Sequence, residues 1–269
     1  MRLSSSIICK HDENKFIKIF NYNKKPNYEK NFNIKGKYQR SFYQCKICKH
    51  IYAAHKFSIK NLYSKQYLEL TYKNTNGIHR RFKEVTGLTK TKSDNKNRAS
   101  RVNNFFSEHN PKVLDVGSGI GVFLFEMKKK KRQVTGVEMD KRYVDYCRKF
   151  HNLQIYRKEL SQFKTKKKFD LITFNKVLEH VRNPTKLLND SKNFLNKNGI
   201  VYIEIPDIKA KTGGKNRQEF CIDHLHVFSV TSLKILAEKC GFKTLQIKTI
   251  HEPSGKYTLF AFLKKLRIK

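Results

Sequence analysis

From Pro111 onward the sequence alternates short apolar runs with stretches of helical spacing, and this alternation restricts the fold more than any other feature. Strand-like runs are expected at 112–116, 134–138, 153–157, 169–175, 200–205, 245–250 and 257–263. Helices are expected at 121–131, 141–150, 184–195 and 231–240. Strands that alternate with helices of about ten residues predict an α/β fold, in which helices cover both faces of a parallel sheet.

A glycine-rich turn joins the first of these strands to the first helix. Gly117, Gly119 and Gly121 permit a tight turn and a close approach of the backbone to a ligand. Asp115 stands two residues before the first glycine. A pyrophosphate is bound by backbone N–H donors without a carboxylate nearby, whereas S-adenosylmethionine (SAM) carries an ammonium and a sulfonium that suit one. The acid therefore favours SAM over a dinucleotide.

Polar residues also follow the next three strands, where ligands of parallel sheets bind. Glu138 ends the second strand and is placed to accept hydrogen bonds from two ribose hydroxyls, although it could instead cap the following helix. Glu159 and Leu160 follow the third strand, where an acid and a backbone N–H could contact an adenine amino group. The segment 174–181 follows the fourth strand and would line the sheet edge beside the reactive methyl group.

With these motifs in this order, residues 112–265 resemble the class I SAM-dependent methyltransferases, in the branch whose fourth strand runs into a V-L-E-H-V segment. The resemblance implies a Rossmann-like, mostly parallel seven-stranded sheet whose final strand is antiparallel. It also implies that the three glycines wrap the methionine part of SAM and that Glu138 holds the ribose. Further implied contacts are those of Met139 with the adenine face, of Glu159 and Leu160 with the adenine edge, and of the Asn175 carbonyl with the ammonium.

The segment 221–229 resembles the H-E-H-L-x-x-F-S segment of sugar C-methyltransferases. This resemblance implies that His224 is the general base, paired with Asp223. A hydroxyl or carbon acid must lose a proton as it attacks the methyl group, and a histidine can take it at neutral pH. Cys221 replaces the first histidine of that segment, and the chain ends without the large C-terminal sugar domain of those enzymes. We therefore expect this chain to share the base-assisted methyl transfer of those enzymes but not their substrate. Alternatively, His224 and His226 have only structural roles.

Six cysteines without a secretion signal indicate reduced thiols or a metal, and a cytoplasmic protein. Cys45 and Cys48 form a C-x-x-C pair, which needs two more ligands for a tetrahedral zinc site. The sugar methyltransferases commonly begin with two such pairs, which implies a zinc-ribbon-like module in residues 1–57. A degenerate metal-free ribbon and unrelated thiols are the alternatives. The candidate ligands are Cys9, His11, Asp12, Cys45 and Cys48, with His50 as a further candidate.

Between this module and the SAM-binding domain, expected at 109–269, lies a polar, Lys- and Asn-rich segment at 58–108. Helical patterning at 62–72 and 99–106 predicts a helical connection or a lid over the substrate. No run of apolar residues is long enough to span a membrane.

The formal net charge of +36 would attract polyanions such as nucleic acid. The excess is mostly Lys and is spread along the chain, which indicates a bias of surface composition; the alternative is polyanion binding through 128–132 and 164–168.

Taken together, the motifs predict a SAM-dependent methyltransferase whose acceptor is a small molecule or a glycosyl group, such as a nucleotide-linked sugar or a surface-polysaccharide precursor. The alternatives are an RNA methyltransferase and a SAM-binding protein without turnover.

Overall fold

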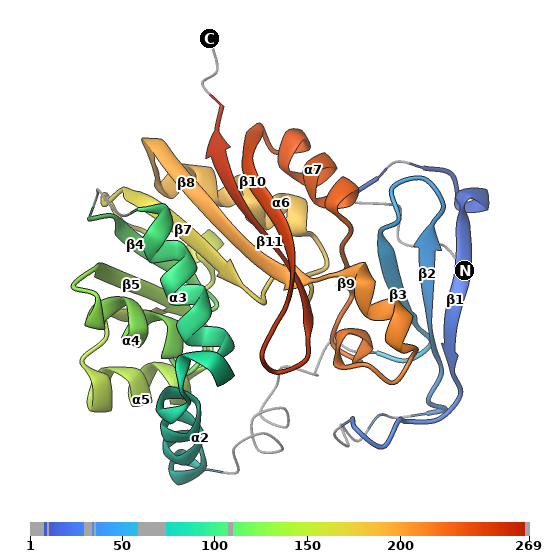
Figure 1. The fold of residues 1–269 in the computed structure, drawn as a ribbon, viewed down its shortest axis with the longest axis horizontal. Helices are drawn as coiled ribbons and strands as arrows, with labels where there is room; N and C mark the ends of the chain where they lie inside the picture. Colours follow the sequence, from blue (N-terminus) through green and yellow to red (C-terminus); the bar gives the residue numbers. More distant parts are fainter. Residues whose placement is uncertain are drawn as a thin grey trace.

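The computed structural model describes residues 8–9, 11–29, 34, 36–58, 74–106 and 110–266. The helix predicted at 62–72 lies outside these residues. Within them the chain forms two sheets, a large one from the C-terminal part and a small one built mainly from the N-terminal part (Figure 1). No helix of the described part is long and apolar enough to cross a membrane.

The large sheet has seven strands among the described residues, in the order β10-β11-β8-β7-β4-β5-β6. Neighbours from β8 to β6 pair in parallel, whereas β11 runs antiparallel to both β8 and β10. The mostly parallel sheet and its antiparallel β11 agree with the expectation from sequence. The bounds are β4 Lys112–Val116, β5 Gln133–Glu138, β6 Ile155–Arg157, β7 Phe169–Asn175, β8 Leu195–Pro206, β10 Phe242–His251 and β11 Tyr257–Lys265.

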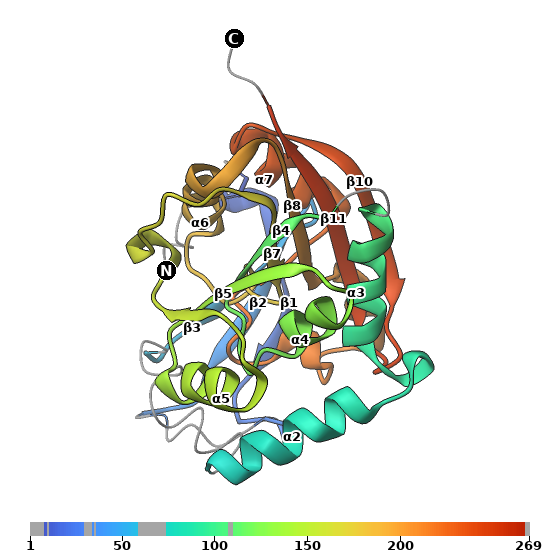
Figure 2. The same ribbon diagram turned by 90° about the vertical axis from the view of Figure 1, so that its left-hand side faces the viewer.

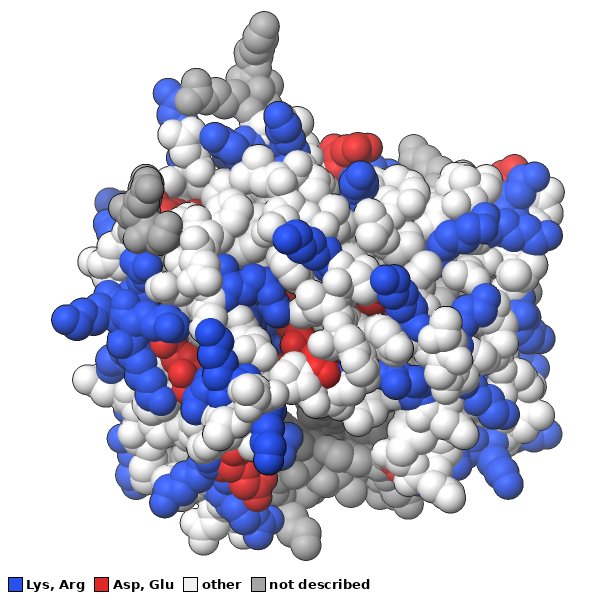
Figure 3. All heavy atoms as spheres, in the orientation of Figure 1, with Lys and Arg blue, Asp and Glu red and all other residues white. Residues whose placement is uncertain are grey.

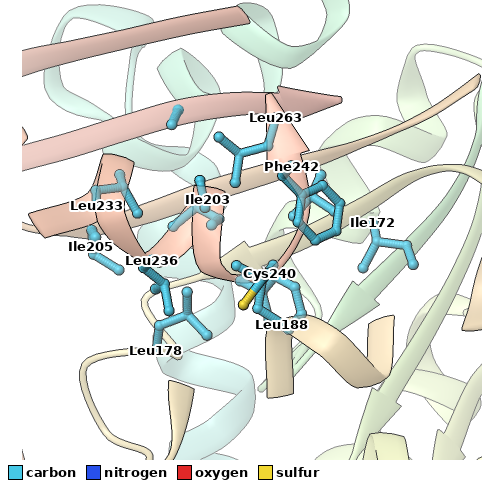
Figure 4. Packing of buried hydrophobic residues seen from close by; sticks show 14 of the residues in the cluster. Ile172, Leu178, Leu188, Ile203, Ile205, Leu233, Leu236, Cys240, Phe242 and Leu263 are labelled. Atoms are coloured by element: carbon cyan, nitrogen blue, oxygen red, sulfur yellow. The ribbon is translucent and has the colours of Figure 1, made fainter. Parts of the chain in front are cut away.

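Helices cover both faces of this sheet, with α3 on one side and α6 on the other in Figure 2. Their bounds are α2 Thr75–Gly87, α3 Asp94–Phe105, α4 Val122–Lys129, α5 Lys141–His151, α6 Pro184–Ser191 and α7 Val230–Lys239. Side chains cap several of them, such as Asn183 at α6 and Ser229 at α7. Leu188 of α6 and Leu236 of α7 belong to the same buried cluster as Ile203 of β8 (Figure 4). This packing fixes the sheet edge at which the strands β4 to β7 end.

One predicted helix is shorter than expected. The helical pattern at 184–195 ends at Ser191, a single 3-10 turn follows, and Leu195 already belongs to β8. Leu195 pairs with Phe169 of β7 and is buried, so burial in the sheet prevails over the local helical spacing. The prediction of a helix up to Leu195 was therefore wrong.

The small sheet has the order β1-β2-β3-β9, with bounds β1 Phe16–Tyr22, β2 Arg40–Cys45, β3 Ile51–His55 and β9 His226–Val227. All three pairings are antiparallel. The strand β9 comes from the loop between β8 and α7, so the N-terminal part is joined to the C-terminal part by backbone hydrogen bonds. Its aromatic core contains Phe42 of β2 and Phe220, which lies in the same loop before β9.

The segment before β4 is also tied to the large sheet. Arg98 and Arg101 of α3 form ion pairs with Glu204 of β8, which is 0% exposed. Phe105 stacks on Phe262 of β11 with ring centroids 3.9 Å apart. The helix α3 is therefore an integral covering of the sheet.

Candidate active site

The glycine-rich turn leaves β4 and is bonded to the neighbouring strand. The amides of Gly117 and Ser118 donate to the Val137 carbonyl at 2.9 and 3.2 Å. Gly117, Gly119 and Gly121 all have positive φ, at 70°, 53° and 77°. A Cβ on Gly117 would lie 2.9 Å from the Val177 side chain, whereas a Cβ on Gly119 would meet nothing within 4 Å. The second glycine therefore faces open space, where a ligand can approach the backbone.

Asp115 lies beneath this turn and is 2% exposed. Its Oδ1 accepts hydrogen bonds from Thr173 Oγ1 at 2.6 Å and from Asn175 Nδ2 at 2.8 Å. Burial raises the pKa of Asp115 to about 7. Among the described residues, the buried Asn175 Oδ1 and Ser118 Oγ have no hydrogen-bond partner. These oxygens can accept hydrogen bonds from an ammonium placed at the turn.

Glu138 ends β5 and connects this strand to the turn. Its Oε2 accepts from the Gly119 amide at 2.8 Å, and its Oε1 accepts from the amides of Met139 and Asp140 at 2.7 and 3.0 Å. Burial raises the pKa of Glu138. The N-cap of α5 is Asp140, whose side chain accepts from the Arg142 amide at 2.8 Å. Glu138 therefore lies before the capping position, beside Gly119.

The remaining residues expected to contact an adenine lie at the ends of β5 and β6. Met139 is 61% exposed and directly follows Glu138. Leu160 is buried, and Glu159 before it is exposed. The two strands are parallel neighbours, so these residues lie along the same edge of the sheet as the glycine-rich turn.

A cavity of about 410 Å³ lies next to this edge. Its lining comes from the N-terminal part, the segment after β7, the loop before β9 and the β10–β11 turn. We call this cavity the acceptor pocket; its polar and aromatic lining includes Tyr28, Glu29, Lys176, Glu179, His180, Glu219, Cys221, Asp223, His224, Lys256 and Tyr257.

His224 lies in the acceptor pocket with one ring nitrogen held. Its Nδ1–H donates to the Glu219 carbonyl at 3.0 Å, so the lone pair of the neutral ring is on Nε2. Burial, followed by the charge of His180, lowers the pKa of His224 to about 4. The two histidine rings meet edge to face with centroids 4.7 Å apart. His224 is therefore neutral at pH 7 and can accept a proton.

Asp223 is buried beside His224, but its hydrogen bonds go elsewhere. It accepts from the Cys221 thiol at 2.9 Å, and one of its oxygens lies 3.6 Å from His180 Nδ1. Although burial opposes ionisation, the charges of His180 and His224 lower the pKa of Asp223 to about 2. The structure thus brings Asp223 and His224 together, with a carboxylate oxygen of Asp223 within 4.8 Å of a ring nitrogen of His224. The Glu219 carbonyl, and not Asp223, orients the His224 ring.

His226 and His50 have a different role, because they connect the small sheet to the segment after β7 and to α7. The His226 Nε2–H donates to the Val181 carbonyl at 3.1 Å. Its Nδ1 then accepts from His50 Nε2, also at 3.1 Å, and His50 Nδ1 lies 3.1 Å from Ser232 Oγ. Burial lowers the pKa of both histidines. With both ring nitrogens in use, His50 is positioned as a structural residue.

The structure brings Cys9, His11, Cys45 and Cys48 together in the N-terminal part, with potential ligand atoms all within 4.8 Å of one another. His11 Nδ1 lies 3.1 Å from Cys45 Sγ. A hydrogen bond from the Cys48 thiol, against the effect of burial, lowers the pKa of Cys9 to about 5. Asp12 is exposed and is not in this group.

Sequence reasoning placed the segment 174–181 at the sheet edge but assigned no role to Lys176, Glu179 or His180. Their position directly after a predicted strand was the signal that the sequence offered. In the structure, Lys176 also has a positive φ of 59°, which is unusual for a residue other than glycine. Tyr28 and Glu29 gave no signal, because only the tertiary structure brings the N-terminal part to the acceptor pocket.

A family model described as a methyltransferase domain matches residues 79–247. The ubiquinone biosynthesis O-methyltransferase of Pelagibacter ubique (strain HTCC1062) is 35% identical over 100 residues, which cover 35% of this chain and 41% of the relative. The match thus spans less than half the length of this curated relative.

Solved structures with a similar fold contain methyltransferase ligands. The plantazolicin methyltransferase BpumL in complex with S-adenosylhomocysteine (SAH) gives a TM-score of 0.57 at 15% identity, covering 77% of this chain and 93% of that one. The Burkholderia thailandensis 1,6-didemethyltoxoflavin-N1-methyltransferase, with 1,6-didemethyltoxoflavin and SAH bound, gives 0.53 at 17% identity, covering 65% and 79%. At these identities the likeness shows the fold. Because the family model matches more than half of the chain, this protein belongs to the methyltransferase-domain family.

Proposed function

We propose that this protein is a SAM-dependent methyltransferase that acts on a small-molecule or glycosyl acceptor, with His224 as the general base. The observation that carries the proposal is the adjacency of two features. A glycine-rich turn bonded to Glu138 lies at the carboxyl edge of the parallel sheet. The acceptor pocket containing His224 begins at the end of β7 with Lys176, and the next residue, Val177, packs against Gly117 of the turn. Ligands of such sheets bind at this edge.

The residues at the turn fit SAM. Asp115 and Asn175 Oδ1 would receive the ammonium, and the open side of Gly119 would let the backbone approach the methionine part. Glu138 would accept from the ribose hydroxyls, and Met139 and Leu160 would enclose the adenine. SAM, when bound, supplies an electrophilic methyl group. Since that group is already reactive, the main task of the protein is to hold the acceptor in line with it.

His224 would remove the proton of the acceptor. Its Nδ1–H is held by the Glu219 carbonyl, so Nε2 accepts the proton as the acceptor atom loses it. The Asp223 carboxylate, which lies nearby, would stabilise the imidazolium that forms. The acceptor atom would keep the electron pair of its broken bond to hydrogen and use it for the new bond to the methyl carbon, while the bond from that carbon to the SAM sulfur breaks and SAH leaves with those electrons.

The size of the pocket and the names of the similar proteins support a small acceptor. A cavity of about 410 Å³ accommodates one small molecule or one sugar unit. The glycosyl option rests on the 221–229 segment. Figure 3 shows Lys and Arg spread over the face of the molecule without one dominant patch, so the charge distribution does not favour RNA on this face.

The test is SAH formation with acceptor mixtures of nucleotide-linked sugars, small amines and phenols, and RNA. We expect turnover with one of the small-molecule mixtures. His224→Ala should lower that turnover by about a hundredfold or more while SAH affinity stays nearly unchanged. The matched control is His251→Ala, because His251 is exposed and lies outside the pocket lining. If His224→Ala turned over as fast as this control, His224 would not be the base.

We further propose that Cys9, His11, Cys45 and Cys48 bind a structural zinc ion. Three thiols and an imidazole are a standard tetrahedral donor set, and the potential ligand atoms of these four residues all lie within 4.8 Å of one another. The metal would hold the residues before β1 against the β2–β3 turn and so support the N-terminal wall of the acceptor pocket.

Metal analysis of the purified protein tests this second proposal. We expect stoichiometric zinc, its loss in Cys48→Ser, and its retention in Cys240→Ala. Cys240 is a buried cysteine of the same core, but it is not one of the four grouped ligands. A zinc-free protein that is as thermally stable as the same protein reconstituted with zinc would contradict the proposal.

A further inference from the structure

Glu179 lies in the acceptor pocket, and its backbone is held in place. Its carbonyl accepts from the amides of Leu225 and His226 at 2.7 and 3.2 Å. Its side chain is 0% exposed. Across the ranges that the structure describes, neither carboxylate oxygen of Glu179 has a hydrogen-bond partner. The pocket therefore contains a buried carboxylate without a donor.

The other acids of the acceptor pocket are already paired. Glu29 accepts from the guanidinium of Arg40 and from the hydroxyl of Tyr38. Glu219 accepts from Arg217 at 2.8 Å and from the amide of Tyr257 at 2.7 Å. Asp223 accepts from the Cys221 thiol, as described above. Among the acids that are described in the pocket lining, Glu179 is thus the one whose two carboxylate oxygens both lack a hydrogen-bond partner.

Lys176 is a cation of the same pocket, but its ammonium is engaged elsewhere. It donates to Thr258 Oγ1 at 2.7 Å and lies 3.8 Å from Glu204. Its field reaches Glu179, as does that of His180, yet burial is the larger effect and raises the pKa of Glu179. Ring nitrogens of His180 and His224 lie within 4.8 Å of a Glu179 oxygen, but neither oxygen has a hydrogen-bond partner among the described residues. The carboxylate can therefore accept hydrogen bonds from a bound ligand.

The chemistry of that ligand follows from the charge. Burying a carboxylate without a partner costs several kcal/mol, and a bound ammonium compensates both the charge and the missing hydrogen bonds. A hydroxyl group on the ligand would donate one hydrogen bond but would leave the negative charge of Glu179 uncompensated. A phosphate group would be repelled by that charge. We propose, on the basis of the methyltransferase function above, that the acceptor carries a protonated amine that binds Glu179. The pocket thus selects a cation although the whole chain has a net charge of +36.

A matched pair of probes tests this assignment without knowledge of the acceptor. Benzylamine and benzyl alcohol have nearly the same shape and differ in the ammonium. Binding of each to the SAH-saturated full-length protein is measured by ligand-observed NMR. We expect the amine to bind about tenfold or more tightly than the alcohol, as is usual for a hydrogen-bonded charge. Glu179→Gln should remove this preference, and Glu238→Gln, an exposed control on α7, should keep it.

Equal binding of the two probes, or a preference that survives in Glu179→Gln, would overturn the assignment. A second readout is the melting temperature of the ligand-free protein. Glu179→Gln removes a buried unpaired charge, so it should leave the melting temperature unchanged or raise it; a clear drop would show that the carboxylate has a partner within the protein. SAH titration on the same samples separates the two proposals. Saturable SAH binding with no amine preference refutes only the assignment of Glu179, whereas no SAH binding refutes the methyltransferase itself.

Discussion

Replacing Glu204 by glutamine should lower the free energy of unfolding by about 3–5 kcal/mol, the usual effect of removing one partner from a buried ion pair. Glu204 is 0% exposed and accepts from Arg98, from Arg101 at 2.9 Å and from the Tyr202 hydroxyl at 2.7 Å. Lys176 lies 3.8 Å away. Glutamine keeps the shape but removes the carboxylate that is in direct contact with both arginines, and the NH₂ group of the glutamine would face the donors that Glu204 now accepts from.

The assay is urea unfolding near neutral pH, followed by far-UV circular dichroism. The matched control is Glu84→Gln, which breaks an ion pair with Arg81 whose side chains are 51% and 57% exposed; it should change stability by less than about 0.5 kcal/mol. The cations also hold the pKa of Glu204 well below its ordinary value of 4.5, although burial opposes them. Its contribution is therefore present above that value and is lost on acidification, so wild type and variant should converge at low pH. A change below about 1 kcal/mol for Glu204→Gln would refute this reasoning, because it would place the network in the range of exposed pairs.

Two further predictions concern the active site. Glu138→Gln should weaken SAH binding about tenfold by removing charge-assisted hydrogen bonds to the ribose; calorimetry checks this, and an unchanged affinity would exclude the ribose contact. Because burial lowers the pKa of His224 to about 4, kcat at saturating SAM and acceptor should stay on its plateau as the pH falls below the ordinary histidine value of 6.5 and decline only near 4. Saturating SAM is needed because the pKa of Asp115, at the SAM site, is raised to about 7. Circular dichroism must confirm that the protein is folded over this range, and an acid limb centred near 6.5 would contradict a buried neutral base.

Much of the large sheet is predictable because its local and long-range signals agree. The strand at 169–175 has apolar residues on both faces, with Leu171, Ile172 and Phe174 buried, as expected for a parallel strand covered on both faces, and β7 has these bounds. The prediction was wrong at Leu195, where burial against Phe169 of β7 draws a residue of helical spacing into β8. A pattern of neighbouring residues in the sequence cannot predict such a pairing between distant segments.

The residues of the SAM site were predictable because each follows a recognisable strand. Parallel strands end at one edge, so Gly119 and Glu138 come together whatever the details of the helices, and their 2.8 Å hydrogen bond reflects this. The acceptor pocket was less accessible to sequence reasoning. Glu29 reaches it from the N-terminal part, and the strand β9 joins that part to the large domain through two residues, His226 and Val227, which are too short a run to signal a strand.

Among the cysteines, spacing identified the C-x-x-C pair but could not choose the remaining ligands. His11, Asp12 and His50 were equally available in the sequence. In the structure His50 is bonded to His226 and Asp12 is exposed, while His11 lies beside Cys45. Only the folded chain distinguishes these three residues, because their roles depend on contacts with segments far away in the sequence.

The most direct test of the central claim is equilibrium titration of the purified protein with SAH by calorimetry. A saturable heat with one site per chain is predicted, weakened in Glu138→Gln and unaffected in His251→Ala. The absence of any saturable heat or thermal protection would contradict a SAM pocket at the glycine-rich turn, and the proposed catalytic role of His224 would lose its basis.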